Sequence, residues 1–314
     1  MPKEFAAAKS SQTSLTIAYL MLIGCALMWG SNHVVARGVN ETVPLAALSF
    51  WRWVVAVLLL LPVCARYLRH DLVVMRAAWR SMFLIGTVGI FMFTIMIYLA
   101  AYNTTAVNTG LLNATTPVWV LLFAALLTKD KPGLRQWIGV LVAGIGTAVI
   151  IAKGDLSVIL KMDFVSGDLF ALVSAMIWAV YSMLLKNAPK GVNPLSLVFV
   201  SALIGLVYLT PFYVWSVLVD GQPFFTSLDP AWPDVLKIFY IGVGPAFLGY
   251  LFWNRGVAAV GPANAGVFLY LMPVFASGLA IVFLGEQLHL FHLGGIALIA
   301  LGIWQATKRP KRAV

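Results

Sequence analysis

The sequence predicts an all-α integral membrane protein of ten transmembrane helices, arranged as two inverted repeats of five. Three observations indicate this fold: an apolar composition, a succession of uncharged segments, and a similarity between the two halves of the chain. Of the 314 residues, 61 % are hydrophobic and only 10 % are charged, whereas soluble domains are about a quarter charged. Such a composition excludes a soluble enzyme, a coiled coil and a disordered chain.

Ten segments are apolar enough to cross a bilayer, for which a helix needs about 20 residues. They are residues 17–36, 43–65, 82–101, 106–128, 136–152, 169–185, 191–219 and 238–254, one helix after the Gly261-Pro262 turn within 256–285, and 287–307. The connectors between them are too short to form separate domains. The sequence has no GxxxxGK[ST] loop, so we expect no ATP-driven pump.

Basic residues predict the orientation of the chain. With both termini placed in the cytoplasm, sixteen of the 21 Lys and Arg residues fall on the cytoplasmic side, as the positive-inside rule requires. We therefore expect a multi-pass protein of the cell (inner) membrane with cytoplasmic termini. The basic residues form short clusters between apolar runs, so we expect the lipid bilayer and no nucleic acid as a partner. Cys25 and Cys64 lie inside apolar runs, where neither a disulfide nor a metal site is expected.

The two halves of the chain resemble each other in register. An offset of 149 residues aligns positions in the first two spans of each half, and an offset of 156 aligns positions in the last three. The aligned pairs are Trp29/Trp178, Arg37/Lys186, Phe50/Phe199 and Pro62/Pro211 at the first offset, and Asn108/Asn264, Gly110/Gly266, Pro117/Pro273, Asp130/Glu286, Gly139/Gly295 and Gly146/Gly302 at the second. They define a first repeat, residues 1–152, and a second, residues 153–314.

Each repeat has five spans, and five is odd, so the second repeat must enter the membrane upside down relative to the first. Inverted repeats are typical of secondary transporters, in which the substrate binds near the membrane midplane where the repeats meet. A channel usually has a pore along an axis normal to the membrane. A membrane-embedded enzyme would need an acid/base set or a metal, and the sequence offers four His residues, no HExxH motif and no carboxylate in the middle of a span.

The aligned residues resemble those of a known family. The end of the first span, LMWGSNHVVARG at residues 27–38, is similar to the W-G-S-N motif of EamA-type members of the drug/metabolite transporter (DMT) superfamily. Residues 108–146 and 264–302 both resemble the repeat signature of that family, with Asp130 where Glu is usual. Size and aromatic content resemble the bacterial YddG-type exporters of aromatic amino acids. The resemblance implies a central cavity lined mainly by the first, third and fourth spans of each half.

Two midspan prolines are candidate hinges. Pro117 and Pro273 cannot donate a helix hydrogen bond, which frees the carbonyls of Asn113 and Leu269. In a membrane, such carbonyls are tolerated inside the bundle or facing a water-filled cavity. The prolines therefore mark helices that bend during transport, with Asn113 facing the substrate, or equally well a packing kink alone.

Polar residues near the end of the first span are candidate substrate ligands. Ser31, Asn32 and His33 follow Trp29 within an apolar helix, where polar side chains should face the bundle interior or a cavity. His33 can hydrogen-bond a carboxylate or titrate near neutral pH. Alternatively, it is a structural histidine that links two helices.

Aromatic side chains that carry a polar atom suit a cavity wall that binds flat apolar groups. The sequence assigns this role to Trp29, Tyr98, Tyr102, Trp178, Tyr181, Trp253 and Tyr270. Each of them can instead belong to the core or to the aromatic belts at the membrane interfaces.

Missing residue types narrow the substrate. No Asp or Glu lies in the middle of a predicted span, although an exporter that exchanges protons for lipophilic cations usually needs one. The sequence therefore favours export of small neutral or zwitterionic metabolites, amino acids including aromatic ones, by alternating access. An exporter of drugs or of nucleotide-sugar-like metabolites is the alternative. We expect no enzymatic activity, no cofactor and no metal, and a monomer is compatible with this architecture.

Overall fold

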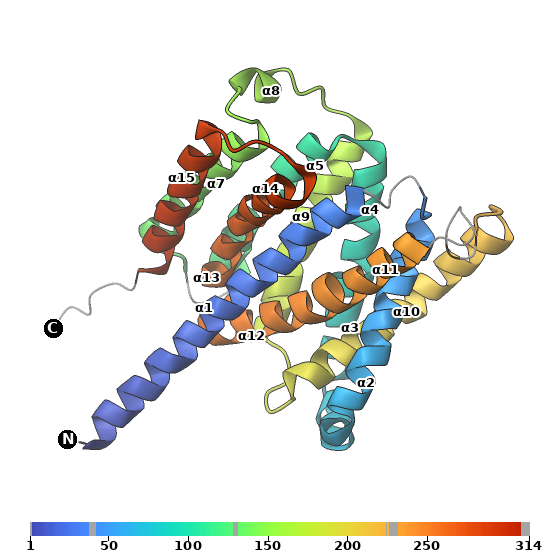
Figure 1. The fold of residues 1–314 in the computed structure, drawn as a ribbon. Helices are drawn as coiled ribbons and strands as arrows, with labels where there is room; N and C mark the ends of the chain where they lie inside the picture. The colour runs from blue at the N-terminus through green and yellow to red at the C-terminus, as the bar shows by residue number, and fades with distance from the viewer. Residues whose placement is uncertain (1, 38–41, 128–130, 224, 226–231, 309–314) are drawn as a thin grey trace.

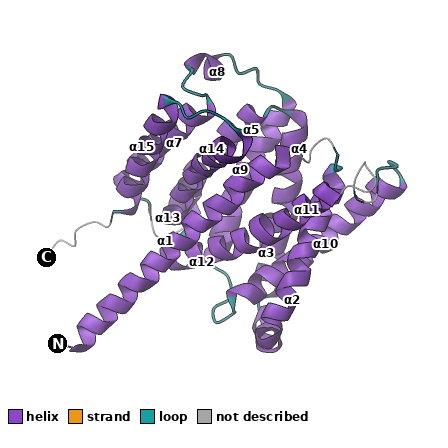
Figure 2. Cartoon of the chain, in the orientation of Figure 1, coloured by secondary structure: helices purple, strands orange, loops and turns teal. Residues whose placement is uncertain are grey.

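The computed structural model describes residues 2–37, 42–127, 131–223, 225 and 232–308, with side chains from Leu15 onward except those of residues 33, 34, 36 and 37. Within these ranges every regular element is a helix (Figure 2). Asp130 and the side chains of His33 and Arg37 lie outside the described residues.

Among the described residues, ten helical segments are long and apolar enough to cross a membrane, as the sequence predicts. They are α1 (Pro2–Arg37), α2 (Leu45–Ala77), α3–η1–α4 (Trp79–Gly86, Thr87–Met92, Phe93–Asn103), α5–α6 (Ala106–Asn113, Thr116–Leu127), α7 (Leu134–Ile151), α9 (Ser166–Lys186), α10 (Pro194–Leu218), α11–η2–α12 (Trp232–Ile241, Gly242–Gly249, Tyr250–Val260), α13–η3–α14 (Pro262–Gly266, Val267–Tyr270, Leu271–Leu284) and α15 (Leu290–Thr307). A short helix, α8 (Leu156–Leu160), lies in the connector between the two repeats (Figure 1).

Two helices extend more than ten residues beyond the predicted spans. α1 begins at Pro2 instead of residue 17, and α2 continues past residue 65 to Ala77. Hydropathy marks only the part of a helix that crosses lipid, whereas the helix itself continues wherever residues with good helix propensity follow. The extension of α2 has a structural role, because the buried Asp71 accepts a hydrogen bond from the backbone N–H of Asn193 (3.2 Å) at the start of α10.

Local sequence signals set several helix ends. α5 begins after Thr105, whose hydroxyl accepts a hydrogen bond from the backbone N–H of Asn108 (3.1 Å). The tight turn between α12 and α13 requires Gly261, because its φ of +80° is unfavourable for residues with a side chain. Pro262 then starts α13 in the first helical turn, where its missing N–H costs no hydrogen bond.

The contact between α7 and α15, which lie side by side (Figure 1), shows the internal repeat directly. A β-carbon on Gly139 would lie 2.5 Å from the carbonyl oxygen of Gly302, and one on Gly146 would lie 2.6 Å from that of Gly295. Gly139 is the repeat equivalent of Gly295, and Gly146 is that of Gly302. The repeat therefore converts the pair Gly139–Gly302 into the pair Gly295–Gly146, and the contact is symmetric between the two repeats. Backbones approach this closely only where side chains are absent.

A second contact occurs once in each repeat. Gly86 of α3 packs against the backbone carbonyl of Ser201 in α10, and Gly242 of η2 packs against that of Arg52 in α2. The offset of 156 converts Gly86 into Gly242, and the offset of 149 converts Arg52 into Ser201. The described structure therefore repeats the packing as well as the sequence pattern, and the odd number of spans makes the two copies inverted.

Both repeats interrupt their third span with a π-helix. Adding 156 to the bounds of η1, 87 and 92, gives 243 and 248, which lie inside η2 (Gly242–Gly249). π-Helical turns are rare and occur frequently at functional sites. The two segments face the centre of the bundle, where Trp53, Tyr181 and Trp253 are completely buried. The outer faces carry exposed apolar side chains such as Leu58 and Phe283, as contact with lipid requires.

Candidate functional site

Five aromatic side chains meet where the two repeats join, and we call them the aromatic cluster. Trp29 lies on α1, Trp178 and Tyr181 on α9, and Tyr250 and Trp253 on α12. The ring of Trp29 lies 4.9 Å from that of Trp178 and 5.7 Å from that of Trp253, measured between centroids. Trp178 also lies 5.0 Å from Tyr181 and 5.4 Å from Tyr250. These spacings are typical of favourable aromatic pairs.

The inverted repeat explains why the two tryptophans face each other. α1 is the first span of the first repeat and α9 the first span of the second, so Trp29 and Trp178 occupy equivalent positions on two antiparallel helices. Their T-shaped contact, with an interplanar angle of 90°, lies where the repeats meet. A site shared by both repeats is where an inverted-repeat protein binds its substrate.

Each π-helical segment supplies a backbone carbonyl to the aromatic cluster. The indole N–H of Trp29 donates to the carbonyl of Pro245 in η2 (3.0 Å), and the hydroxyl of Tyr250 donates to that of Gly89 in η1 (2.8 Å). Gly89 and Pro245 differ by 156 residues, so the two carbonyls are repeat equivalents. Their partners are not equivalent, because the indole N–H of Trp178 has no hydrogen-bond partner among the described residues.

Three buried donors in or beside the aromatic cluster are unpaired within the described part of the chain. They are the indole N–H groups of Trp178 and Trp253 and the side-chain amide nitrogen of Asn254. The Asn254 carbonyl oxygen accepts a hydrogen bond from the hydroxyl of Tyr181 (2.8 Å). An unpaired donor in an apolar interior is costly. The aromatic cluster can therefore accommodate a ligand that brings acceptor atoms.

The polar residues at the end of α1 lie beside η2 and α11. The Ser31 hydroxyl donates to the carbonyl of Met28 (2.8 Å) and accepts from the hydroxyl of Tyr240 (2.5 Å). The side-chain oxygen of Asn32 is buried and has no partner in the described part of the chain. The side chain of His33 lies outside the described residues, so its assignment stays a prediction.

The other three predicted aromatic residues are not members of the aromatic cluster. The hydroxyl of Tyr98 accepts a hydrogen bond from Arg52 (3.0 Å) in a buried group that adjoins the aromatic cluster through Trp53. Tyr102 is 42 % exposed and donates to the carbonyl of Val43 (3.0 Å), which joins the end of α4 to the start of α2. Tyr270 is buried in η3, and its hydroxyl points toward Gly144 of α7.

Both spans with a midspan proline are interrupted at the proline. α5 ends at Asn113 and α6 begins at Thr116, directly before Pro117. The freed carbonyl of Asn113 accepts a hydrogen bond from the Thr116 hydroxyl (2.6 Å). In the second repeat, a 3₁₀-helix, η3, precedes α14, in which Pro273 is the third residue. Whether these interruptions act as gates, and whether Asn113 contacts a substrate, stays a prediction.

Sequence reasoning missed Tyr250, Asn254 and Arg52. Tyr250 has the same chemistry as the predicted tyrosines, and the repeat offset that links its acceptor Gly89 to Pro245 could have indicated it. Arg52 is the single charge within the predicted span 43–65, and it is only 6 % exposed. The signal was present in the sequence: a single charge inside a 23-residue apolar segment needs a reason.

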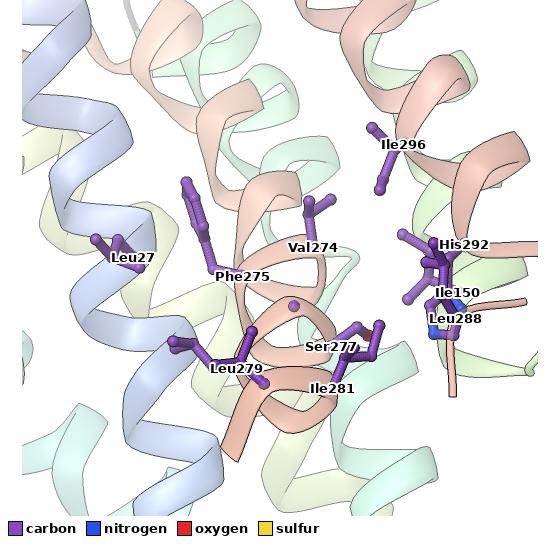
Figure 3. A pocket seen from close by; sticks show the side chains of 12 residues that line it. Leu27, Ile150, Val274, Phe275, Ser277, Leu279, Ile281, Leu288, His292 and Ile296 are labelled. Atoms are coloured by element: carbon purple, nitrogen blue, oxygen red, sulfur yellow. The ribbon is translucent and has the colours of Figure 1, made fainter. Parts of the chain in front are cut away.

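The two described cavities lie outside the aromatic cluster. A cavity of about 370 Å³ opens between α1, α14 and α15, with Leu27, Phe275 and Ile296 in its wall (Figure 3). Its lining is almost entirely apolar, which suits a lipid chain or a lipophilic solute. A second cavity of about 420 Å³ lies at the end of α2, between Arg66, Asp71 and Asn193.

Two inverted five-helix repeats that meet at a buried centre with unpaired polar groups are an architecture found in membrane transporters. The sequence profile of the EamA-like transporter family matches the chain twice, at residues 16–152 and at residues 165–307. The chain belongs to the EamA-like transporter family, and it is a multi-pass membrane transporter rather than an enzyme. The two matches cover all ten spans, five in each.

Several curated relatives are transporters. The uncharacterized transporter YyaM of Bacillus subtilis is 25 % identical over 293 residues, which cover 92 % of this chain and 93 % of the relative. An uncharacterized transporter of Archaeoglobus fulgidus is 26 % identical over 302 residues, 96 % and 99 % of the two chains. A probable terminal-alkyne amino-acid exporter of Streptantibioticus cattleyicolor is 26 % identical over 226 residues, 72 % of each chain. A crystal structure that covers 92 % of this chain and 96 % of its own, at 22 % identity, has a TM-score of 0.76 and shares the fold.

Proposed function

We propose that this protein exports small zwitterionic metabolites, amino acids including aromatic ones, by alternating access. The observation that carries the proposal is the aromatic cluster with its three unpaired donors. Aromatic faces bind an ammonium group and flat apolar side chains, while the indole N–H groups of Trp178 and Trp253 and the amide of Asn254 can donate to acceptor atoms of the solute. No Asp or Glu hydrogen-bonds to the aromatic cluster among the described residues, so a solute that carries its own negative charge is favoured over a simple cation.

The relatives support the same substrate class. One of them is named as a probable amino-acid exporter, and the resemblance to YddG-type exporters of aromatic amino acids points in the same direction. In the proposed orientation, both termini are cytoplasmic, and the end of α1 near Asn32 faces the outside. Ser31, Asn32 and His33 would then line the exit side of the substrate path.

The repeat-equivalent carbonyls of Gly89 and Pro245 suggest how access to the two sides of the membrane alternates. In the described state Trp29 binds the carbonyl of Pro245, and the carbonyl of Gly89 binds Tyr250. In the alternate state, the two repeats would exchange their conformations. The indole N–H of Trp178 would then donate to the second lone pair of the Gly89 carbonyl, beside Tyr250, and Trp29 would be released. One hydrogen bond would thus be exchanged for its equivalent, so that the two states differ little in free energy.

A second candidate is export of lipophilic drugs. The apolar cavity between α1, α14 and α15 favours it, because a solute dissolved in the bilayer could enter there sideways. The absence of a carboxylate bonded to the aromatic cluster, in the described part of the chain, opposes it for cationic drugs.

Transport by the purified protein in liposomes tests the proposal. We would load the vesicles with labelled phenylalanine, threonine or a quaternary-ammonium drug and measure efflux with and without a pH gradient. We expect efflux of both amino acids without a strict need for the gradient. Proton-driven transport of the drug alone would refute the proposal.

Variants separate the site from the fold. Trp178→Ala and Trp253→Ala should raise the KM for phenylalanine about tenfold, because loss of stacking and a hydrogen bond together removes about 1.4 kcal/mol. Trp79→Ala is the matched control, since Trp79 is 59 % exposed and lies at the start of α3. Equal KM values for all three variants would exclude the aromatic cluster as the substrate site.

A further inference from the structure

We propose that the guanidinium of Arg52 binds the carboxylate of the transported solute, at a site next to the aromatic cluster. The site consists of Arg52 and Ser49 on α2 and Thr94 and Tyr98 on α4. It deepens the proposed function and rests on it, because it names the group by which a zwitterionic or anionic solute is recognised. Its binding test, however, does not require transport.

Arg52 carries a charge that no described residue neutralises. The residue is 6 % exposed, yet no ion pair with it occurs among the described residues. Its two terminal nitrogens donate to neutral oxygens, Nη1 to the hydroxyl of Tyr98 (3.0 Å) and Nη2 to that of Thr94 (2.9 Å). Buried charges in membrane proteins normally pair with an opposite charge or lie on a substrate path. An anionic partner is therefore missing from the described site.

Two polar atoms of the site are free to bind that partner. The Nε of Arg52 and the hydroxyl of Ser49 are both buried and have no hydrogen-bond partner among the described residues. Ser49 precedes Arg52 by three residues on α2, so their side chains lie on the same face of the helix. A carboxylate has two oxygens, which can accept from an arginine fork and from a hydroxyl at the same time.

The remaining side chains of the site hold the guanidinium in one orientation. The guanidinium carbon of Arg52 lies 5.4 Å from the ring centroid of Trp53 and 5.1 Å from that of Tyr98. These rings hold the guanidinium plane in place. Thr94 fixes both neighbours, since its hydroxyl also accepts from the indole N–H of Trp53 (3.3 Å). The guanidinium is thus oriented before a solute arrives.

The site is continuous with the aromatic cluster. The ring of Trp53 lies 4.9 Å from that of Tyr250, a member of the cluster. The backbone carbonyl of Arg52 packs against Gly242 of η2, the same π-helical segment whose Pro245 carbonyl binds Trp29. A solute whose ring occupies the aromatic cluster can therefore place its carboxylate toward Arg52.

The second repeat shows that the packing does not need the arginine. Ser201 is the repeat equivalent of Arg52, and its carbonyl makes the same contact, with Gly86 in place of Gly242. The equivalents of Thr94 and Tyr98 are Tyr250 and Asn254. The duplicated fold therefore forms the same helix contact without a charge, and the guanidinium must be explained by something other than packing.

Binding of three probes to the purified full-length protein tests the proposal. 3-Phenylpropionate carries only the carboxylate, phenethylamine carries only the ammonium, and phosphatidylglycerol represents an anionic lipid headgroup. Stabilisation against heat would be measured for each probe with the wild type, Arg52→Gln, Ser49→Ala and Arg66→Gln. Arg66 is the matched control, because it lies on the same helix and is exposed.

We expect Arg52→Gln to weaken 3-phenylpropionate binding at least tenfold and to leave phenethylamine binding unchanged. Without a probe, Arg52→Gln should melt no earlier than the wild type, because it removes an uncompensated buried charge. Ser49→Ala, which suits a helix, should weaken 3-phenylpropionate binding several-fold and keeps the test valid if Arg52→Gln does not fold. Arg66→Gln should behave as the wild type with every probe.

Three results would overturn the proposal: unchanged 3-phenylpropionate binding in both Arg52→Gln and Ser49→Ala, an equal loss of both small probes, or Arg52-dependent stabilisation by phosphatidylglycerol alone. Failure of the proposed function looks different. If the wild type exports no amino acid but binds 3-phenylpropionate through Arg52, the carboxylate site stands. If phenylalanine is exported with the same KM by Arg52→Gln and Ser49→Ala, the site is refuted and amino-acid export stands.

Discussion

The unequal hydrogen bonds of the two equivalent tryptophans predict opposite effects of two nearly identical substitutions. Trp29→Phe removes the hydrogen bond to the carbonyl of Pro245 (3.0 Å), which exists in the described state. Trp178→Phe removes an indole N–H that has no partner in this state. In the alternate state, in which the two repeats exchange their conformations, this N–H would donate to the carbonyl of Gly89. The first substitution should disfavour the described state, and the second should favour it.

The expected size follows from the value of one buried hydrogen bond, about 0.5 to 1.5 kcal/mol net. Each substitution should therefore shift the equilibrium between the two states about 2- to 13-fold, in opposite directions. The ratio between the two variants is larger, about 5- to 150-fold, because the two effects add. Both phenylalanine rings keep most of the aromatic contact, so the packing change is similar in the two variants.

Single cysteines at Ser31 and Ser182 can report the equilibrium. Both serines are buried, and they lie near the ends of α1 and α9, which the inverted repeat directs to opposite membrane faces. The native Cys25 and Cys64 are buried and give a low background. The ratio of modification rates by a membrane-impermeant thiol reagent, applied from each side, should rise in one variant and fall in the other. A change in the same direction in both variants, or below twofold in both, would refute the exchange of hydrogen bonds.

Three further predictions concern stability and binding. Gly295→Ala should lower the free energy of unfolding by about 1 to 3 kcal/mol, because the new β-carbon would collide with Ile150. Gly294→Ala is the control: its β-carbon has no neighbour within 4 Å, so the free energy of unfolding should rise by up to about 1 kcal/mol. Asp168→Ala should cost about 3 kcal/mol in the same denaturation assay, since this buried carboxylate accepts three hydrogen bonds, whereas the exposed Asp155→Ala should cost about 1 kcal/mol or less. Tyr181→Phe should raise the KM for phenylalanine about 2- to 13-fold and lower the free energy of unfolding by about 1 to 3 kcal/mol, because it releases the amide that the tyrosine hydroxyl holds at 2.8 Å and leaves its oxygen unpaired.

The ten spans could be predicted because length and hydropathy decide whether a segment crosses a membrane. The repeat could be predicted because equivalent backbone contacts need equivalent small residues, as in the pairs Gly139/Gly295 and Gly146/Gly302. The extension of α2 to Ala77 could not. Hydropathy marks only the part of a helix that crosses lipid, and it contains no information on the contact of Asp71 with the start of α10, in the other repeat.

The candidate site was only partly predictable. Trp29, Trp178, Tyr181 and Trp253 meet as one group, whereas Tyr98, Tyr102 and Tyr270, chosen on the same chemical grounds, lie elsewhere. A ring with a polar atom suits the core, the interface and a binding site equally well, and the face of the helix on which it lies decides among them. That face is set by packing between repeats, and the sequence of one helix does not specify it.

Arg52 was misjudged for a related reason. Seven residues into α2, it stands close enough to the helix end for its charge to reach water if that end were free. The structure buries it instead, because α4 supplies Thr94 and Tyr98 on one side and η2 packs on the other. Burial of a charge is a property of the neighbours, so it becomes visible only when the helices are assembled.

The comparison of the two repeats separates what the fold needs from what the function needs. The glycine contacts between α7 and α15 are symmetric between the two halves, and those of Gly86 and Gly242 are repeat equivalents of each other. This equal packing lets two states, in which the repeats exchange their conformations, have similar free energies. The polar groups differ: Arg52, Thr94 and Tyr98 in one half correspond to Ser201, Tyr250 and Asn254 in the other. A transporter needs both properties, since equal packing permits the exchange between states and unequal polar groups let a bound solute favour one of them. The residues at which the duplicated halves disagree are therefore the ones to test for substrate recognition.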